Sequence, residues 1–150
     1  MNSPESATAS FWRSPAARWL GLLHGLFYAI SGAWPVVHLP SFLVVTGPKV
    51  DTWLVQTVGA LLAVTGVALT LAAQRRRLNG DWALVAGGQA ASLGIVDVIF
   101  VSDDRISPIY LLDAAVEFPL AVGWLVLGVI ACRRGLPPAH PGPHDPTRRS

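Results

Sequence analysis

The chain has 150 residues, 52% of them hydrophobic and 13% charged, with a mean hydropathy of +0.48 and a formal net charge of +2. Soluble domains average about 25% charged residues, so this composition argues against an ordinary soluble domain. The single cysteine, Cys132, excludes an intramolecular disulfide and a cysteine-based metal site. The three arginines at 75–77 have no aromatic residues interleaved with them, so we expect no nucleic-acid partner.

Four apolar segments are each long enough to cross a bilayer as a helix, which takes about 20 residues. They cover residues 19–37, 53–73, 82–101 and 109–131. None has a polar face of the width that a soluble helical core needs. The sequence therefore predicts an all-α fold, an integral membrane four-helix bundle that occupies residues 15–132.

Several residues mark where the predicted helices begin and end. Hydroxyl and carboxylate side chains that can cap helices stand before the four segments, at Ser14, Asp51, Asp81 and Ser107. Pro35 and Pro40 are predicted to end the first helix. The short apolar segment 41–45 is too short to span and is expected to lie along the membrane surface.

The two ends of the chain differ in composition from the middle. The N-terminal end is rich in serine and alanine, and residues 133–150 are dense in proline. We therefore predict disordered tails over 1–14 and 133–150. An alternative is that the first 33 residues are a signal peptide that is cleaved after Ser31-Gly32-Ala33.

The basic residues predict the orientation, because cytoplasmic loops are enriched in Lys and Arg. If both termini are cytoplasmic, the outer side holds only Lys49 and Arg105. The cytoplasmic side then holds nine arginines, which are Arg13, Arg18, Arg75, Arg76, Arg77, Arg133, Arg134, Arg148 and Arg149. We therefore expect both termini to be cytoplasmic.

Small residues four positions apart predict where helices approach closely in lipid. The third segment carries the most of them, including Gly87, Gly88 and Gly94, so we expect it to lie centrally with neighbours on both sides. Alternatively, the face with Gly21 and Gly25 mediates a homodimer. The spacing does not separate contacts within one chain from contacts between chains.

Three carboxylates interrupt the apolar sequence around the turn between the third and fourth segments. At about 1.5 Å per residue, Asp97 and Asp113 lie about 6 Å inside the outer ends of their helices, and Glu117 about 12 Å. Asp113 and Glu117 share one helix face. A charged aspartate at mid-membrane costs roughly 2.5–3.5 kcal/mol, so we expect all three to face the bundle interior or a water-filled cleft.

Other polar residues are expected near these acids. Gln56 and Ser31 join the three acids as candidate ligand-binding residues, and no metal site is predicted. Secondary candidates are His38, Lys49, Tyr28 and His24. His24 lies in the cytoplasmic half, where a hydrogen bond to a neighbouring helix is the preferred interpretation.

Pro119 leaves one backbone carbonyl of the fourth helix without its donor and is expected to kink the helix beside Glu117.

Two interpretations of the acids remain open. They can clamp helices, for example Asp97 to Gln56 or Asp113 to Lys49, or they can form a ligand site. The preferred function is a small-ligand or lipid-binding accessory subunit with an acidic pocket in the outer half of the bilayer.

Two other classes of function are kept beside this one. The first is a membrane-embedded acid/base enzyme, an isomerase or redox-associated protein, in which carboxyls in different protonation states act on a lipidic substrate. Its catalytic residues are left unassigned. The second is a proton- or cation-coupled transport subunit, for which few polar residues continue toward the cytoplasm.

The stretch PSFLVVTGPKVDTWLVQTVGALLAVTGVAL, residues 40–69, resembles small four-span bacterial membrane proteins of the DoxX-like class. The shared pattern is an outer turn followed by a glycine-dotted second span. The whole is also similar in architecture to EXPERA-type bundles, which bind or isomerise lipids and sterols. The resemblance implies a location in the bacterial inner membrane and a quinone or lipid as ligand. It also implies membrane lipids, and a larger membrane complex or a homo-oligomer, as partners.

Overall fold

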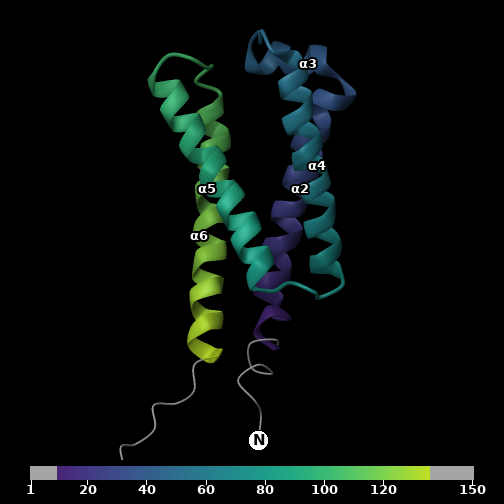
Figure 1. The fold of residues 1–150 in the computed structure, drawn as a ribbon, viewed down its shortest axis with the longest axis vertical. Helices are drawn as coiled ribbons and strands as arrows, with labels where there is room; N and C mark the ends of the chain where they lie inside the picture. Colours follow the sequence, from purple (N-terminus) through teal and green to yellow (C-terminus); the bar gives the residue numbers. More distant parts are fainter. Residues whose placement is uncertain (1–9, 136–150) are drawn as a thin grey trace, which may run out of the picture.

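A computed structural model describes residues 10–135, and this part of the chain is helical without strands. It contains α2 (Pro15–Val37), α3 (Leu39–Thr46), α4 (Thr52–Gln74), α5 (Gly80–Ser102) and α6 (Tyr110–Gly135) (Figure 1). All but α3 are long and apolar enough to cross a membrane. The predicted all-α fold with four long apolar helices is confirmed.

The capping residues are partly those expected. Ser14 accepts a hydrogen bond on Oγ from the Ala17 amide, at 3.3 Å, and so caps α2. Asn79 caps α5 in place of Asp81, because its Oδ1 accepts from the Trp82 amide at 3.1 Å. Asp51 precedes α4 without a capping hydrogen bond from its side chain.

Pro35 does not end the first helix as predicted, because α2 continues to Val37. A proline removes one helical hydrogen bond, which a well-packed helix tolerates. Here Pro35 is buried against α4, where a Cβ built on Gly59 would lie 2.7 Å from its Cγ. The helix ends at His38, and Pro40 falls in the first turn of α3 instead.

The described helices and packed side chains extend beyond residues 15–132 at both ends. Phe11 and Trp12 fall in the predicted N-terminal tail, yet they are only 8% and 5% exposed in a cluster that includes Leu78. At the other end α6 continues three residues past the predicted boundary, to Gly135. Residues 1–9 and 136–150 of the predicted tails lie outside the described residues.

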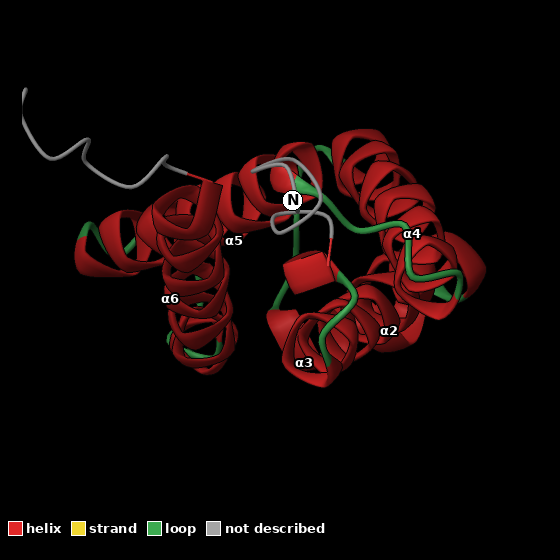
Figure 2. Ribbon diagram, turned by 90° about the horizontal axis from the view of Figure 1, so that it is seen from below, coloured by secondary structure: helices red, strands yellow, loops and turns green. Residues whose placement is uncertain are grey.

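The long helices associate as two pairs. α2 packs along α4 and α5 packs along α6, whereas contacts between the pairs are few and mainly join α2 to α6. Figure 1 shows the pairs close together near the start of α2 and the end of α6, and diverging toward α3 and the α5–α6 turn. Figure 2, seen along the long axis, shows α2 beside α4 and α5 beside α6. The arrangement is therefore a split bundle that is open at one end.

Glycines on both helices allow α2 and α4 to approach closely. A Cβ on Gly25 would lie 2.8 Å from the Gly66 carbonyl oxygen, and one on Gly32 would lie 2.5 Å from the Gly59 carbonyl oxygen. The face with Gly21 and Gly25, an alternative dimer interface in the sequence, is thus covered by α4 of the same chain. Backbone contact of this kind is typical of membrane helices.

The prediction that the third segment, α5, lies centrally is wrong. It packs mainly along α6. Gly87 and Gly94 face α6, where added Cβ atoms would lie 2.9 Å from Trp124 Cβ and 3.3 Å from Glu117 Cβ. A Cβ on Gly88 would meet nothing within 4 Å. The small residues of α5 are spread around its circumference, so only one of its faces packs.

Candidate ligand-binding site

A cavity of about 440 Å³ lies between the two helix pairs at their diverging end. α2, α3 and α4 form one side of it, and α5 and α6 form the other. Most of the side chains that line it are apolar or aromatic. They include Trp34, Pro35, Phe42, Val45, Leu54, Val55, Val58, Leu62, Leu93 and Ile109.

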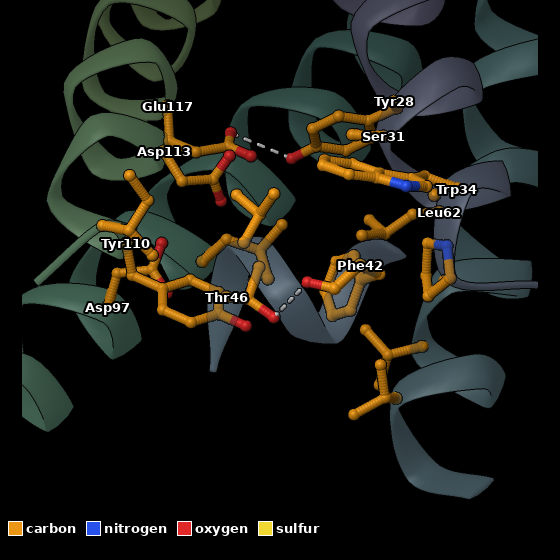
Figure 3. A pocket seen from close by; sticks show the side chains of 18 of the residues that line it. Tyr28, Ser31, Trp34, Phe42, Thr46, Leu62, Asp97, Tyr110, Asp113 and Glu117 are labelled. Atoms are coloured by element: carbon orange, nitrogen blue, oxygen red, sulfur yellow. Dashed lines mark hydrogen bonds between the residues drawn. The ribbon is translucent and has the colours of Figure 1, made fainter. Parts of the chain in front are cut away.

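The three acids lie together on the α5–α6 side of this cavity (Figure 3). Asp97 and Glu117 are buried, with 7% and 1% of their surfaces exposed, and Asp113 is half-buried. Asp97 and Asp113 both line the cavity, and their carboxyls are close enough to influence each other electrostatically. The expectation that the acids face the interior rather than lipid agrees with this placement.

Glu117 is bonded across the gap between the helix pairs. The Tyr28 hydroxyl, from α2, donates a 3.0 Å hydrogen bond to Glu117 Oε2 on α6. Both side chains are about 1% exposed, and both line the cavity. Tyr28, a secondary candidate in the sequence, is therefore the direct partner of the most deeply placed acid.

Asp97 differs from Glu117 because one of its oxygens is unsatisfied. Asp97 Oδ2 is buried and has no hydrogen-bond partner. Leaving a buried polar atom unpaired costs about 1–3 kcal/mol. A proton shared with the neighbouring Asp113 carboxyl would satisfy this oxygen.

His24 lies one helical turn from Tyr28, away from the cavity. Its Nδ1 accepts a 2.9 Å hydrogen bond from Trp124 Nε1 of α6, so it is bonded to a neighbouring helix as expected. Its ring packs edge-on against the Tyr28 ring, with centroids 4.2 Å apart. His24 thus supports the Tyr28–Glu117 pair without lining the cavity.

The remaining sequence candidates are distributed differently from the prediction. Ser31 lines the cavity, and its hydroxyl donates to the Phe27 carbonyl at 2.8 Å. Gln56 is exposed on α4 and does not line the cavity, so the predicted clamp from Asp97 to Gln56 does not form. The helical period explains this, because Val55 and Gly59 turn toward the cavity and the residue after Val55 is rotated away.

Two basic candidates lie near the open end of the cavity. His38 Nδ1 accepts from the Ser41 amide at 3.2 Å and thereby caps α3. Lys49 donates to the Thr46 carbonyl at 3.2 Å and lies 4.7 Å from the centroid of the Tyr110 ring. Lys49 is therefore engaged with α3 and Tyr110, not with Asp113 as the second predicted clamp required.

The sequence did not predict that α3 forms part of the cavity wall. Trp34 Nε1 donates a 2.8 Å hydrogen bond to Ser41 Oγ, and the Trp34 and Phe42 rings pack edge-to-face with centroids 5.6 Å apart. These contacts fold α3 back against α2, so that Phe42 and Thr46 line the cavity. A short apolar segment between Pro40 and Gly47 was a signal for a helix, but not for which surface it covers.

Although the three acids lie together, they are not arranged as a metal site. Within residues 10–135 no set of three or more His, Cys, Asp or Glu side chains is arranged to hold a metal ion. Beside the carboxyls the cavity is lined by the hydroxyls of Tyr28, Tyr110, Thr46 and Ser31. Those of Tyr28, Thr46 and Ser31 already donate within the protein and are left to act as acceptors.

Comparisons with protein-family models, with curated proteins and with solved structures gave no match to this chain. The resemblance to DoxX-like and EXPERA-type proteins therefore stays a prediction. Function is therefore inferred from the residues and geometry of the site itself.

Proposed function

We propose that this is a multi-pass membrane protein of the bacterial inner membrane that binds a small lipidic ligand from the outer half of the bilayer. The four long apolar helices support membrane insertion. The ends of the described chain lie at the same end of the bundle, as an even number of spans requires. The arginines of the α4–α5 connection and of the end of α6 are at that end too, which supports a cytoplasmic location for it.

This orientation predicts the behaviour of reporter fusions. A reporter that is active only in the cytoplasm should give full signal when fused to the C-terminus, and one that is active only in the periplasm should give none. A fusion within the α5–α6 turn, residues 103–109, should give the opposite pattern. Periplasmic activity at the C-terminus would show that the arginine bias does not set the topology.

The observation that carries the ligand-binding proposal is the cavity between the helix pairs. Its volume of about 440 Å³ falls within the range of about 300–1,000 Å³ that is typical of small-molecule pockets. One side offers apolar and aromatic side chains, and the other offers three carboxyls. A molecule with an apolar body and a polar head, such as a lipid or a quinone, matches this division. A structural clamp needs no such space.

An enzyme that uses these acids is the second candidate. Glu117 is held by the Tyr28 hydroxyl, whereas Asp97 and Asp113 face each other. Carboxyls in such different surroundings can hold different protonation states, as acid/base catalysis on a lipidic substrate requires.

Mass spectrometry of the intact protein purified in mild detergent tests ligand binding directly. We expect a lipid or quinone to stay bound to the wild type. Val55→Trp, which fills the cavity from the α4 side, should remove it. Val67→Trp on the same helix is the matched control, because Val67 is 51% exposed and does not line the cavity. Equal retention by Val55→Trp and the wild type would contradict binding in this cavity.

A further inference from the structure

The charged residues that line the cavity are all acidic. Among the described residues, those that line the cavity include Asp97, Asp113 and Glu117 and no basic residue. An ionised carboxylate within a bilayer is stable only when it is paired, hydrated or protonated. Glu117 has the Tyr28 hydroxyl, whereas Asp97, which lines the same space, has its Oδ2 atom buried without a partner. An ionised carboxylate on this wall would repel an anionic headgroup, which disfavours phosphate- and carboxylate-headed ligands.

Aromatic rings stand near the acids in the same cavity. Tyr28, Trp34, Phe42 and Tyr110 line it from α2, α3 and α6 (Figure 3). Aromatic faces attract cations by about 0.5–2 kcal/mol, most strongly where water is excluded. One of these rings already has a cation on its face, since Lys49 Nζ lies 4.7 Å from the Tyr110 centroid. Aromatic rings beside carboxylates are the combination that recognises ammonium groups.

We propose that the ligand of this cavity is a lipophilic cation, with an ammonium head among the acids and aromatic rings and an apolar body against Leu54, Val58 and Leu62. This inference depends on the proposed binding function and specifies the class of ligand. The head neutralises the acidic wall that Asp97, Asp113 and Glu117 form. Lys49, which shares the Tyr110 ring at the open end, competes with the ligand for that ring and repels its charge.

A matched pair of probes separates charge from shape. Octyltrimethylammonium and its neutral isostere, in which a carbon atom replaces the nitrogen, are titrated into the full-length protein in lipid nanodiscs, with empty nanodiscs as the partition control. Binding is followed by tryptophan fluorescence. We expect the cation to bind about 10-fold or more tightly than the isostere, since an ion pair and a cation–π contact together exceed 1.4 kcal/mol. Val55→Trp should abolish saturable binding of the cation.

Variants of the charged residues supply the second readout. Asp113→Asn should weaken cation binding about 10-fold and leave the isostere unchanged, whereas Lys49→Gln should strengthen cation binding about 2-fold. A contrary result is that the wild type binds cation and isostere equally, with both lost in Val55→Trp. That result would overturn the cation proposal but still support ligand binding in this cavity. Saturable binding of neither probe would overturn the cation proposal. Binding of both that survives in Val55→Trp would also contradict the proposed cavity.

Discussion

Replacing Gly66 with leucine should separate α2 from α4 and cost at least about 3 kcal/mol of unfolding free energy, the upper part of the range for overpacking. A Cβ at this position would lie 2.5 Å from the Gly25 carbonyl oxygen and 2.8 Å from the Tyr28 carbonyl carbon. Both neighbours are backbone atoms, which cannot rotate out of the way as a flexible side chain can. Because Tyr28 is in this contact, we expect the Tyr28–Glu117 hydrogen bond to be lost as well.

Gly88→Leu is the matched control for this substitution. Gly88 is also within a long apolar helix, but a Cβ there would meet nothing within 4 Å. The two substitutions add the same side chain and change helix propensity equally. Unfolding in mixed micelles should therefore show a change within about 0.5 kcal/mol for Gly88→Leu. Equal destabilisation by both leucines would mean that the close approach of α2 and α4 does not contribute to stability.

The helices themselves could be predicted from the sequence, but their partners could not. An apolar run of about 20 residues identifies a span by its length and composition alone. Glycine spacing identifies a face that another helix can approach, but not which helix does so. For this reason Gly21 and Gly25 were open to a dimer interpretation, and Gly88 was assigned a neighbour that it lacks. The pairing of α2 with α4 depends on complementary glycines on both helices.

The candidate site was predictable to a similar extent. Three acids within apolar sequence have few favourable places in a membrane protein other than its interior, so their grouping followed from energetics. Gln56 was misplaced because depth in the membrane does not fix direction around the helix axis. Phe42 and Thr46 were missed because α3 is held by the Trp34–Ser41 hydrogen bond, which only the folded chain brings together. Tyr28 was undervalued because its partner is 89 residues away in the sequence.

Neutralising either Glu117 or Asp113 should weaken ligand binding about 10-fold or more with little effect on the fold. Glu117→Gln keeps an oxygen that can accept from the Tyr28 hydroxyl, so the bond between α2 and α6 can persist. Asp113→Asn removes a like charge facing Asp97. We expect the free energy of unfolding to change by no more than about 0.5 kcal/mol, or to rise as crowding of like charges is relieved. Retention of the co-purified ligand in mass spectrometry should fall about 10-fold or more, as expected when one buried charged contact is lost.

Glu117→Leu separates a binding role from a clamping role. Leucine cannot accept the Tyr28 hydrogen bond, so this variant should lose about 1–3 kcal/mol because a buried hydroxyl is left unpaired. Tyr28→Phe combined with Glu117→Leu removes both partners and should recover much of that loss, since neither polar group is then stranded. If Glu117→Gln were as unstable as Glu117→Leu, the charge itself would hold the helix pairs together and the acids would be a clamp. If Glu117→Gln folds like the wild type but releases its ligand, the charge is kept for binding, because the hydrogen bond alone suffices to join α2 to α6.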